Sequence, residues 1–167
     1  MRHGFIVSIA LLTVLSGCVI LSAPGSFAVV QGPKATQSTP VPSYKATFRG
    51  LLSGSISVVT DDGEVCSGKW GFIAATTAAK DGSSAADAAP APLPNSVNMG
   101  ADWDLVYGRG YYVAHVVGNK LYARAMLTGQ KGTVIYAEFS NETNERGQTK
   151  GVAEDNHGNI FKVSVYN

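Results

Sequence analysis

Hydrophobic and polar residues alternate along most of the chain from Tyr44 onward. Tyr44, Ala46 and Phe48 are separated by Lys45 and Thr47, so their side chains would share one face of a strand. A period of two is typical of half-buried β-strands. The alternation recurs in the segments 55–58, 66–72, 102–107, 111–117, 121–127, 135–139 and 161–165. The pattern predicts about eight antiparallel strands in meander order.

Turn signals between these segments favour hairpins. Asp61-Asp62-Gly63 is a typical hairpin turn, and Gly118-Asn119 lies between two alternating segments. A two-residue turn at Gly118-Asn119 would pair Ala114 with Ala123. Ala and Gly are frequent on the expected inner face, which suits a narrow interior. We therefore expect an all-β fold, a small antiparallel barrel or barrel-like sandwich without amphipathic helices.

Two segments lack the alternation. Residues 29–43 contain Pro33, Pro40 and Pro42, which disfavour helix and central strand, so this segment is expected to be a flexible tether. Residues 74–98 are rich in Ala, Ser and Pro. They are expected to form a low-complexity loop inside the domain, and loops of this length are either functional or disordered.

The N-terminal residues have the pattern of an export signal. Arg2 precedes an apolar run over residues 4–15, as in secretory signals. The motif Leu15-Ser16-Gly17-Cys18 matches the bacterial lipobox. This match implies cleavage before Cys18 and attachment of lipid to its sulfur.

Two other outcomes stay open for this segment. Ser26-Phe27-Ala28 is a small-x-small pattern suited to an ordinary signal peptidase, which would remove residues 1–28. If nothing is cleaved, residues 4–22 are an uncharged stretch just long enough to span a bilayer of about 30 Å.

The expected organisation follows from these patterns. Residues 1–17 would be a lipoprotein signal peptide, residues 18–43 a lipidated Cys18 with its tether, and residues 44–167 a single β-domain. In Gram-negative lipoproteins, Val19 rather than Asp at this position favours the outer membrane, with the domain facing the periplasm. Cleavage after Ala28 would instead give a soluble periplasmic or secreted protein.

Composition narrows the possible functions. The chain has 167 residues, of which 15% are charged, and a formal net charge of +1. This balance argues against nucleic-acid binding, which normally requires a basic patch. Two cysteines cannot form a disulfide scaffold. The sequence has no zinc, phosphate-loop or dinucleotide motif, so no metal or cofactor is expected.

Few residues suggest catalysis. Cys66 is in phase with Trp70 and is expected to point into the core, although a thiol near a histidine could serve a Cys-dependent enzyme. Asp102 and Asp104 would face outward together on a strand, as a conceivable glycosidase pair. The segment 155–159 is interpreted as a turn because it lacks the acid pattern of a calcium loop. No catalytic residue is assigned.

A possible ligand face consists of Tyr111, His115, Tyr122 and Arg124, which the predicted hairpin would carry on its outward side. Aromatic and cationic side chains together can bind a sugar, an anion or a partner. The ordinary alternative is a solvated sheet face.

The chain also resembles uncharacterised bacterial lipoproteins. The resemblance is carried by the lipobox, by Val30-Gln31-Gly32-Pro33 and by the segments 63–70 and 151–159. It implies a cell-envelope address and no catalytic residue. The expected function is a lipid-anchored envelope protein that contacts the membrane through acyl-Cys18 and has a binding or structural role, with an envelope protein as a possible partner. The alternatives are a ligand- or carbohydrate-binding barrel and a Cys-dependent enzyme.

Overall fold

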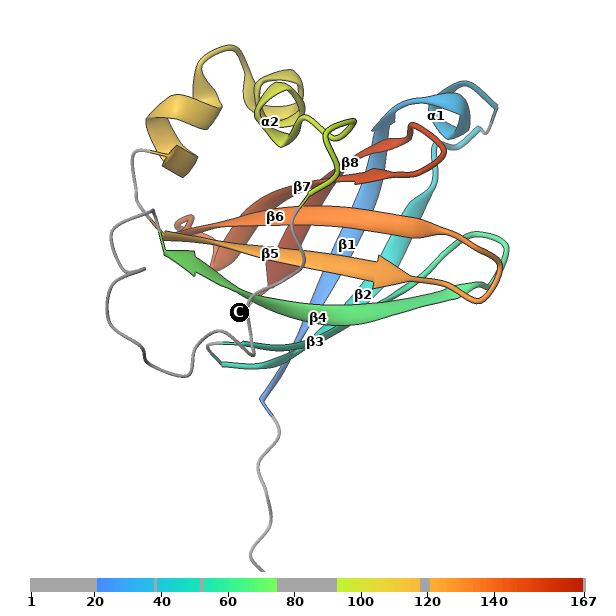
Figure 1. The fold of residues 1–167 in the computed structure, drawn as a ribbon, viewed down its shortest axis with the longest axis horizontal. Coiled ribbons are helices and arrows are strands. Elements are labelled where there is room, and N and C mark those ends of the chain that lie inside the picture. Colours follow the sequence, from blue (N-terminus) through green and yellow to red (C-terminus); the bar gives the residue numbers. More distant parts are fainter. Residues whose placement is uncertain (1–20, 38, 52, 75–92, 118–120, 167) are drawn as a thin grey trace, which may run out of the picture.

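Eight antiparallel strands in meander order close into a barrel, because β8 pairs with β1 (Figure 1). The computed structural model describes residues 21–37, 39–51, 53–74, 93–117 and 121–166. The strands are β1 (Ser22–Gln31), β2 (Ser43–Gly50), β3 (Ser53–Val59), β4 (Val65–Ala74), β5 (Leu121–Thr128), β6 (Val134–Thr143), β7 (Gln148–Asp155) and β8 (Ile160–Tyr166). The prediction of an all-β barrel is confirmed.

The barrel interior is packed by alternate residues of every strand. Phe27, Tyr44 and Phe161 are almost completely buried, and the ring of Phe161 contacts both of the other rings. Ala125 and Ala137 face the same interior, so small and large side chains share the space. An eight-stranded barrel is just wide enough for such filling or for one small ligand.

Strand β1 lies in the segment that was predicted to be tether. Residues 22–31 pair with β2 on one side and with β8 on the other. Gly25, Phe27 and Val29 point inward with a period of two. Pro24 lies near the start of the strand, where proline is tolerated. The tether prediction is therefore wrong for these residues, and the domain begins at Ser22 rather than at Tyr44.

A short helix, α1 (Pro33–Gln37), follows β1 and also lies within the predicted tether. Pro33 is its first residue, where the missing N–H costs nothing. Ala35 packs against the barrel core, so α1 covers one end of the barrel (Figure 1). We call this the closed end, and the end where β1 starts the mouth.

The connection between β4 and β5 contains two helices instead of two strands. These are α2 (Met99–Tyr107) and a short π-helix, η2 (Tyr112–Val117). The predicted strands 102–107 and 111–117 are wrong. Trp103, Leu105 and Tyr107 alternate in the sequence, but Leu105 is exposed and Trp103 is buried. Met99, Trp103 and Tyr107 are spaced four residues apart, as on one face of a helix, and they form the buried side of α2.

The predicted hairpin around Gly118-Asn119 is therefore also wrong. Strand β5 pairs with β4 and β6, so Ala123 lies opposite Phe72 and Phe139. Of the predicted loop 74–98, Ala74 ends β4, and residues 75–92 lie outside the described residues. Helix α2 packs on the outside of β7 and β8 (Figure 1). Among the described residues, no helix has the length and apolar character needed to cross a membrane.

Candidate functional site

The mouth of the barrel holds a cavity of about 660 Å³, which lies within the size range of small-molecule sites. The strands converge on it from all sides, with the starts of β1 and β5 and the ends of β2, β4 and β8 around it. Its lining is formed by Leu21, Ser22, Ala23, Pro24, Phe48, Gly50, Leu51, Trp70, Phe72, Ala123, Phe139, Ser140, Thr149, Val165 and Tyr166.

Two phenyl rings separate this mouth cavity from the packed core. Phe48 of β2 and Phe139 of β6 meet edge to face, with ring centroids 5.3 Å apart and planes at 88°. Each ring lies over a glycine. A Cβ on Gly25 would come within 2.7 Å of Phe48, and one on Gly151 within 2.7 Å of Phe139. The two glycines therefore give the rings the room to lie where they do.

The side wall combines aromatic rings with small residues. Trp70 and Phe72 of β4 meet edge to face at 6.0 Å, and the Trp70 Nε1–H donates to the carbonyl of Arg49 at 3.1 Å. Ala123 faces the same space from β5. A larger side chain at this inward position would fill part of the cavity.

The described lining of the cavity includes hydroxyl groups and no charged side chain. Its polar side chains belong to Ser22, Ser140, Thr149 and Tyr166, and none of the described lining residues is an acid, a base or a cysteine. Such a lining can hold an apolar or amphipathic molecule through burial of its hydrocarbon surface.

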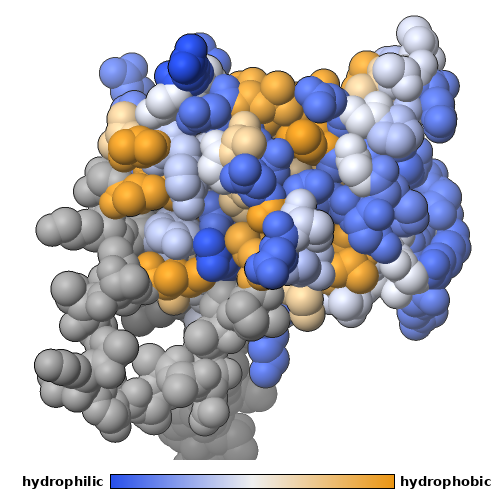
Figure 2. Space-filling model, turned by 45° about the horizontal axis from the view of Figure 1, so that its top comes forward, coloured by the Kyte–Doolittle hydropathy of each residue, from blue (hydrophilic) through white to orange (hydrophobic). Residues whose placement is uncertain are grey.

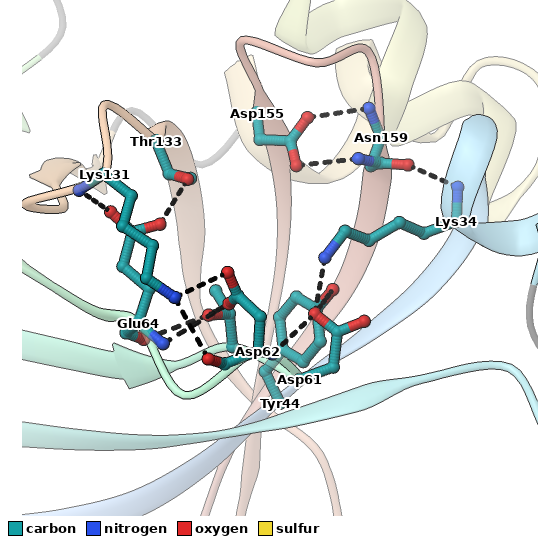
Figure 3. A network of polar contacts seen from close by, with 10 residues as sticks. Lys34, Tyr44, Asp61, Asp62, Glu64, Lys131, Thr133, Asp155 and Asn159 are labelled. Atoms are coloured by element: carbon teal, nitrogen blue, oxygen red, sulfur yellow. Dashed lines mark hydrogen bonds and ion pairs between the residues drawn. The ribbon is translucent and has the colours of Figure 1, made fainter.

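The opposite, closed end is filled by a polar network that joins α1 to three turns (Figure 3). Lys34 of α1 forms an ion pair with Asp61, and its Nζ lies 5.3 Å from the centre of the Tyr44 ring. Tyr44 donates its hydroxyl hydrogen to Asp61 at 3.2 Å. The hydrogen bond from Lys34 lowers the pKa of Asp61. These contacts hold α1 across the barrel end.

The same network continues through two other turns (Figure 3). Asn159 accepts from the backbone N of Lys34 at 2.8 Å and donates to Asp155 at 2.8 Å. Glu64 accepts from Thr133 at 2.6 Å, and Lys131 donates to Asp62 at 3.0 Å. A cavity of about 280 Å³ lies among these groups. Since the acids and bases satisfy one another, we interpret the network as a structural closure.

The four residues of the predicted ligand face do not lie on one hairpin. Tyr111 and His115 belong to the helical segment, and Tyr122 and Arg124 belong to β5. On the helices, Trp103 stacks on Tyr111 at 5.8 Å and Tyr111 on His115 at 4.3 Å. On β5, Arg124 lies 5.4 Å from the centre of the Tyr122 ring. All four predicted residues thus belong to one region, outside the barrel wall and beneath or beside α2.

Glu138 connects the two halves of this region. It is fully buried and accepts from Arg124 Nε at 2.7 Å and from Trp103 Nε1 at 3.2 Å. Burial raises the pKa of Glu138, and the Arg124 guanidinium opposes the rise. The Arg124 side chain is therefore used to compensate a buried carboxylate, so it is not a freely available ligand group.

The two acids of the conceivable glycosidase pair have separate roles. Asp104 accepts backbone N–H groups of Gly110 and Tyr112 at 2.9 and 3.0 Å, which caps η2 and lowers its pKa. Asp102 is buried against the barrel, with its Oδ2 atom unpartnered. Burial and the neighbouring Glu154 and Glu138 raise the pKa of Asp102 to about 7.

Cys66 points into the core, as its phase with Trp70 predicted. Its side chain is completely buried and free of disulfide. Burial, together with the nearby Glu64 carboxylate, raises the pKa of its thiol to about 11. A thiol in this state is a poor nucleophile. Within the described residues no group of three or more His, Cys, Asp or Glu side chains is arranged to hold a metal ion.

Sequence reasoning identified several lining residues as inward-facing but missed the cavity itself. Phe48, Trp70 and Phe139 all fall on the expected core face. The sequence alternation is the same for residues that line the cavity and for residues that pack in the core. The small alanine side chains at the inward positions 123 and 125 were the available signal for an unfilled volume inside the barrel.

Comparison of the chain with protein-family models, with curated proteins and with solved structures gave no match.

Proposed function

We propose that this protein is a lipid-anchored protein of the bacterial cell envelope whose barrel binds an apolar or amphipathic small molecule in the mouth cavity. The observation that carries the binding role is the uncharged cavity of about 660 Å³, floored by Phe48 and Phe139. The other end is covered by α1 and lined by charged side chains, so the mouth is the apolar route of entry.

The anchoring part of the proposal draws support from strand β1. Cleavage after Ala28 would remove Phe27, which is completely buried in the core, and most of the strand that joins β2 to β8. Cleavage before Cys18 leaves the whole strand in the mature chain. Retention of the whole strand supports processing at the lipobox over processing after Ala28.

The other functions considered from the sequence receive less support. A sugar site needs hydrogen-bonding side chains and an accessible aromatic platform, whereas the cavity is mainly apolar and Arg124 is paired with Glu138. A Cys-dependent enzyme needs a reachable thiolate, whereas Cys66 is buried and has a raised pKa. A structural role in the envelope is compatible with the barrel but does not account for the mouth cavity.

Fluorescence of Trp70 tests the binding role. The lipidated protein, held in amphipol without a bilayer, is titrated with a brominated medium-chain fatty acid, since bromine quenches nearby indole rings. Saturable quenching is expected. Ala123→Leu should weaken it by filling the cavity, whereas Ala114→Leu, the same change on the exposed surface of η2, should not. Equal quenching of both variants, or none, would refute the binding role.

The mass of the mature protein tests the anchor. We expect an N-terminus at Cys18 carrying two or three acyl chains, which together give durable attachment. A soluble product beginning at Val29 would contradict it.

A further inference from the structure

We infer that the mouth of the barrel is the surface that lies against the bilayer, so that the cavity receives acyl chains of the surrounding membrane lipids. This inference rests on the proposed lipid anchor and adds an orientation and a ligand source. It is carried by the position of the first strand, the exposed apolar rim and the distribution of charge along the barrel.

The first strand leaves almost no spacer between lipid and barrel. Leu21 lines the mouth, and its carbonyl accepts the backbone N–H of Gly50 at 3.0 Å. Only two residues separate it from Cys18. Since an extended chain spans at most about 3.6 Å per residue, acyl-Cys18 can lie no more than about 11 Å from Leu21. The anchor thus holds the mouth, rather than any other part of the barrel, at the membrane surface.

The rim of the mouth carries large exposed hydrophobic side chains. Leu51, in the turn between β2 and β3, is 71% exposed, Leu21 is 55% exposed and Tyr166 is 41% exposed. All three also line the cavity. Leucine side chains gain by insertion among acyl chains, and tyrosine is favoured at the level of lipid headgroups. The rim therefore has the composition of an interfacial membrane contact.

The charged residues of the barrel are placed as this orientation requires, with basic residues near the mouth and several acidic ones at the closed end. Arg49 and Lys69 are exposed and lie on one row of neighbouring strands close to the rim, each opposite Ser55. Basic residues at this level attract anionic headgroups. Glu145 and Arg146 in the turn between β6 and β7 carry opposite formal charges. At the closed end, the acids Asp61, Asp62, Glu64 and Asp155 outnumber the bases Lys34 and Lys131, which pair with Asp61 and Asp62.

The hydropathy of the surface agrees with an orientation in which the closed end faces water. Figure 2 shows that the end with the β3–β4 and β5–β6 turns, at the right, is covered mainly by hydrophilic residues. On the face that carries the helices, hydrophobic residues form small separate patches between polar ones. A barrel oriented with its closed end toward water exposes this hydrophilic end to solvent.

Depth-sensitive quenching tests the orientation. The lipidated protein is reconstituted into vesicles of phosphatidylethanolamine and phosphatidylglycerol whose acyl chains are either plain or brominated. The chain has two tryptophans: Trp70 lines the cavity, whereas Trp103 lies on the buried side of α2 and is completely buried. We expect the brominated lipids to quench the fluorescence of the unaltered protein. Trp70→Phe should abolish this quenching, which assigns it to the mouth.

Matched rim variants sharpen the test. Leu51→Asp should remove the quenching, because a carboxylate at the rim opposes insertion, whereas Leu105→Asp on α2, where Leu105 is 50% exposed, should keep it. Quenching by the free brominated fatty acid but not by brominated phospholipids would overturn the orientation and leave the binding role intact. Absence of quenching in both experiments would refute binding and orientation together.

Discussion

Phe48 and Phe139 meet edge to face, 5.3 Å apart, and divide the barrel into a packed half and a hollow half. They come from β2 and β6, which are not neighbours in the sheet, so the contact crosses the interior. Below it lie Phe27, Tyr44 and Phe161, and above it lies the mouth cavity. The depth of the cavity is therefore set by two side chains.

Truncation of one of these rings should deepen the cavity and weaken the fold. Phe139 is 4% exposed, and Phe→Ala changes at such sites cost about 3–5 kcal/mol in the free energy of unfolding. Urea unfolding of Phe139→Ala measures this cost. Leu105→Ala on the exposed surface of α2 is the control and should change little. A cost below that of the control would mean that the ring is not part of the packed floor.

Removal of Arg124 should leave a buried charge uncompensated. Glu138 is completely buried and depends on Arg124 at 2.7 Å. Arg124→Met should therefore cost about 3–5 kcal/mol in unfolding free energy, the range found when one partner of a buried ion pair is lost. The double variant Arg124→Met/Glu138→Gln should recover part of that loss, because no charge remains buried. A double-mutant cycle by urea unfolding measures the coupling; purely additive effects would contradict it.

Asp102 should make the stability fall as the pH rises from about 4 to about 7. Its pKa is raised to about 7 in the folded protein, whereas that of an unfolded Asp is about 3.9. Between these values the folded state holds a proton that the unfolded state has lost, so the unfolding free energy decreases with increasing pH and then levels off.

Asp102→Asn should remove this component of the pH dependence. At pH 8 the variant should be more stable than the unaltered protein, by an amount on the order of 2–4 kcal/mol. At pH 4 the two should be similar. Thermal or urea unfolding across this pH range provides the measurement. Parallel stability curves for the two proteins would show that Asp102 ionises normally.

Asn159 should be needed to hold α1 over the closed end. Its buried amide joins the backbone N of Lys34 to the Asp155 carboxylate. Asn159→Ala leaves both groups without this partner and should cost about 1–3 kcal/mol. Amide hydrogen exchange should accelerate in residues 33–37. His157→Ala is the control, since His157 contributes its backbone N–H and its side chain is exposed. Unchanged exchange in Asn159→Ala would contradict the proposed role.

Strands with regular alternation and clear turns could be predicted from the sequence. The segments around Phe48, Cys66 and Phe161 each have one apolar face, and all form strands. Asp62-Gly63 precedes the second segment and His157-Gly158 precedes the third. The number of strands was also predicted correctly, although β1 and β7 take the places of two segments that are helical. Local pattern suffices where one face of a strand meets the core and the other meets water.

The helices could not be separated from strands by that pattern. Trp103 and Tyr107 fit a period of two as well as a helical spacing, and only packing against the barrel decides between them. β1 was hidden for another reason: Phe27 and Val29 follow an export signal and precede several prolines. The cavity depends on which small residues meet across the interior, so it requires the closed barrel and its register.

The pairing of β1 with β8 has a consequence for how the chain folds. Phe27 lies opposite Val163, so the seam that completes the ring joins the first strand to be synthesised with the last. Each of the strands β2 to β7 can pair with the preceding strand once it has been synthesised. The barrel cannot close until residues 160–166 are also present. Such long-range closure slows folding. Loss of the final strand would therefore leave two unprotected sheet edges that can pair with other chains.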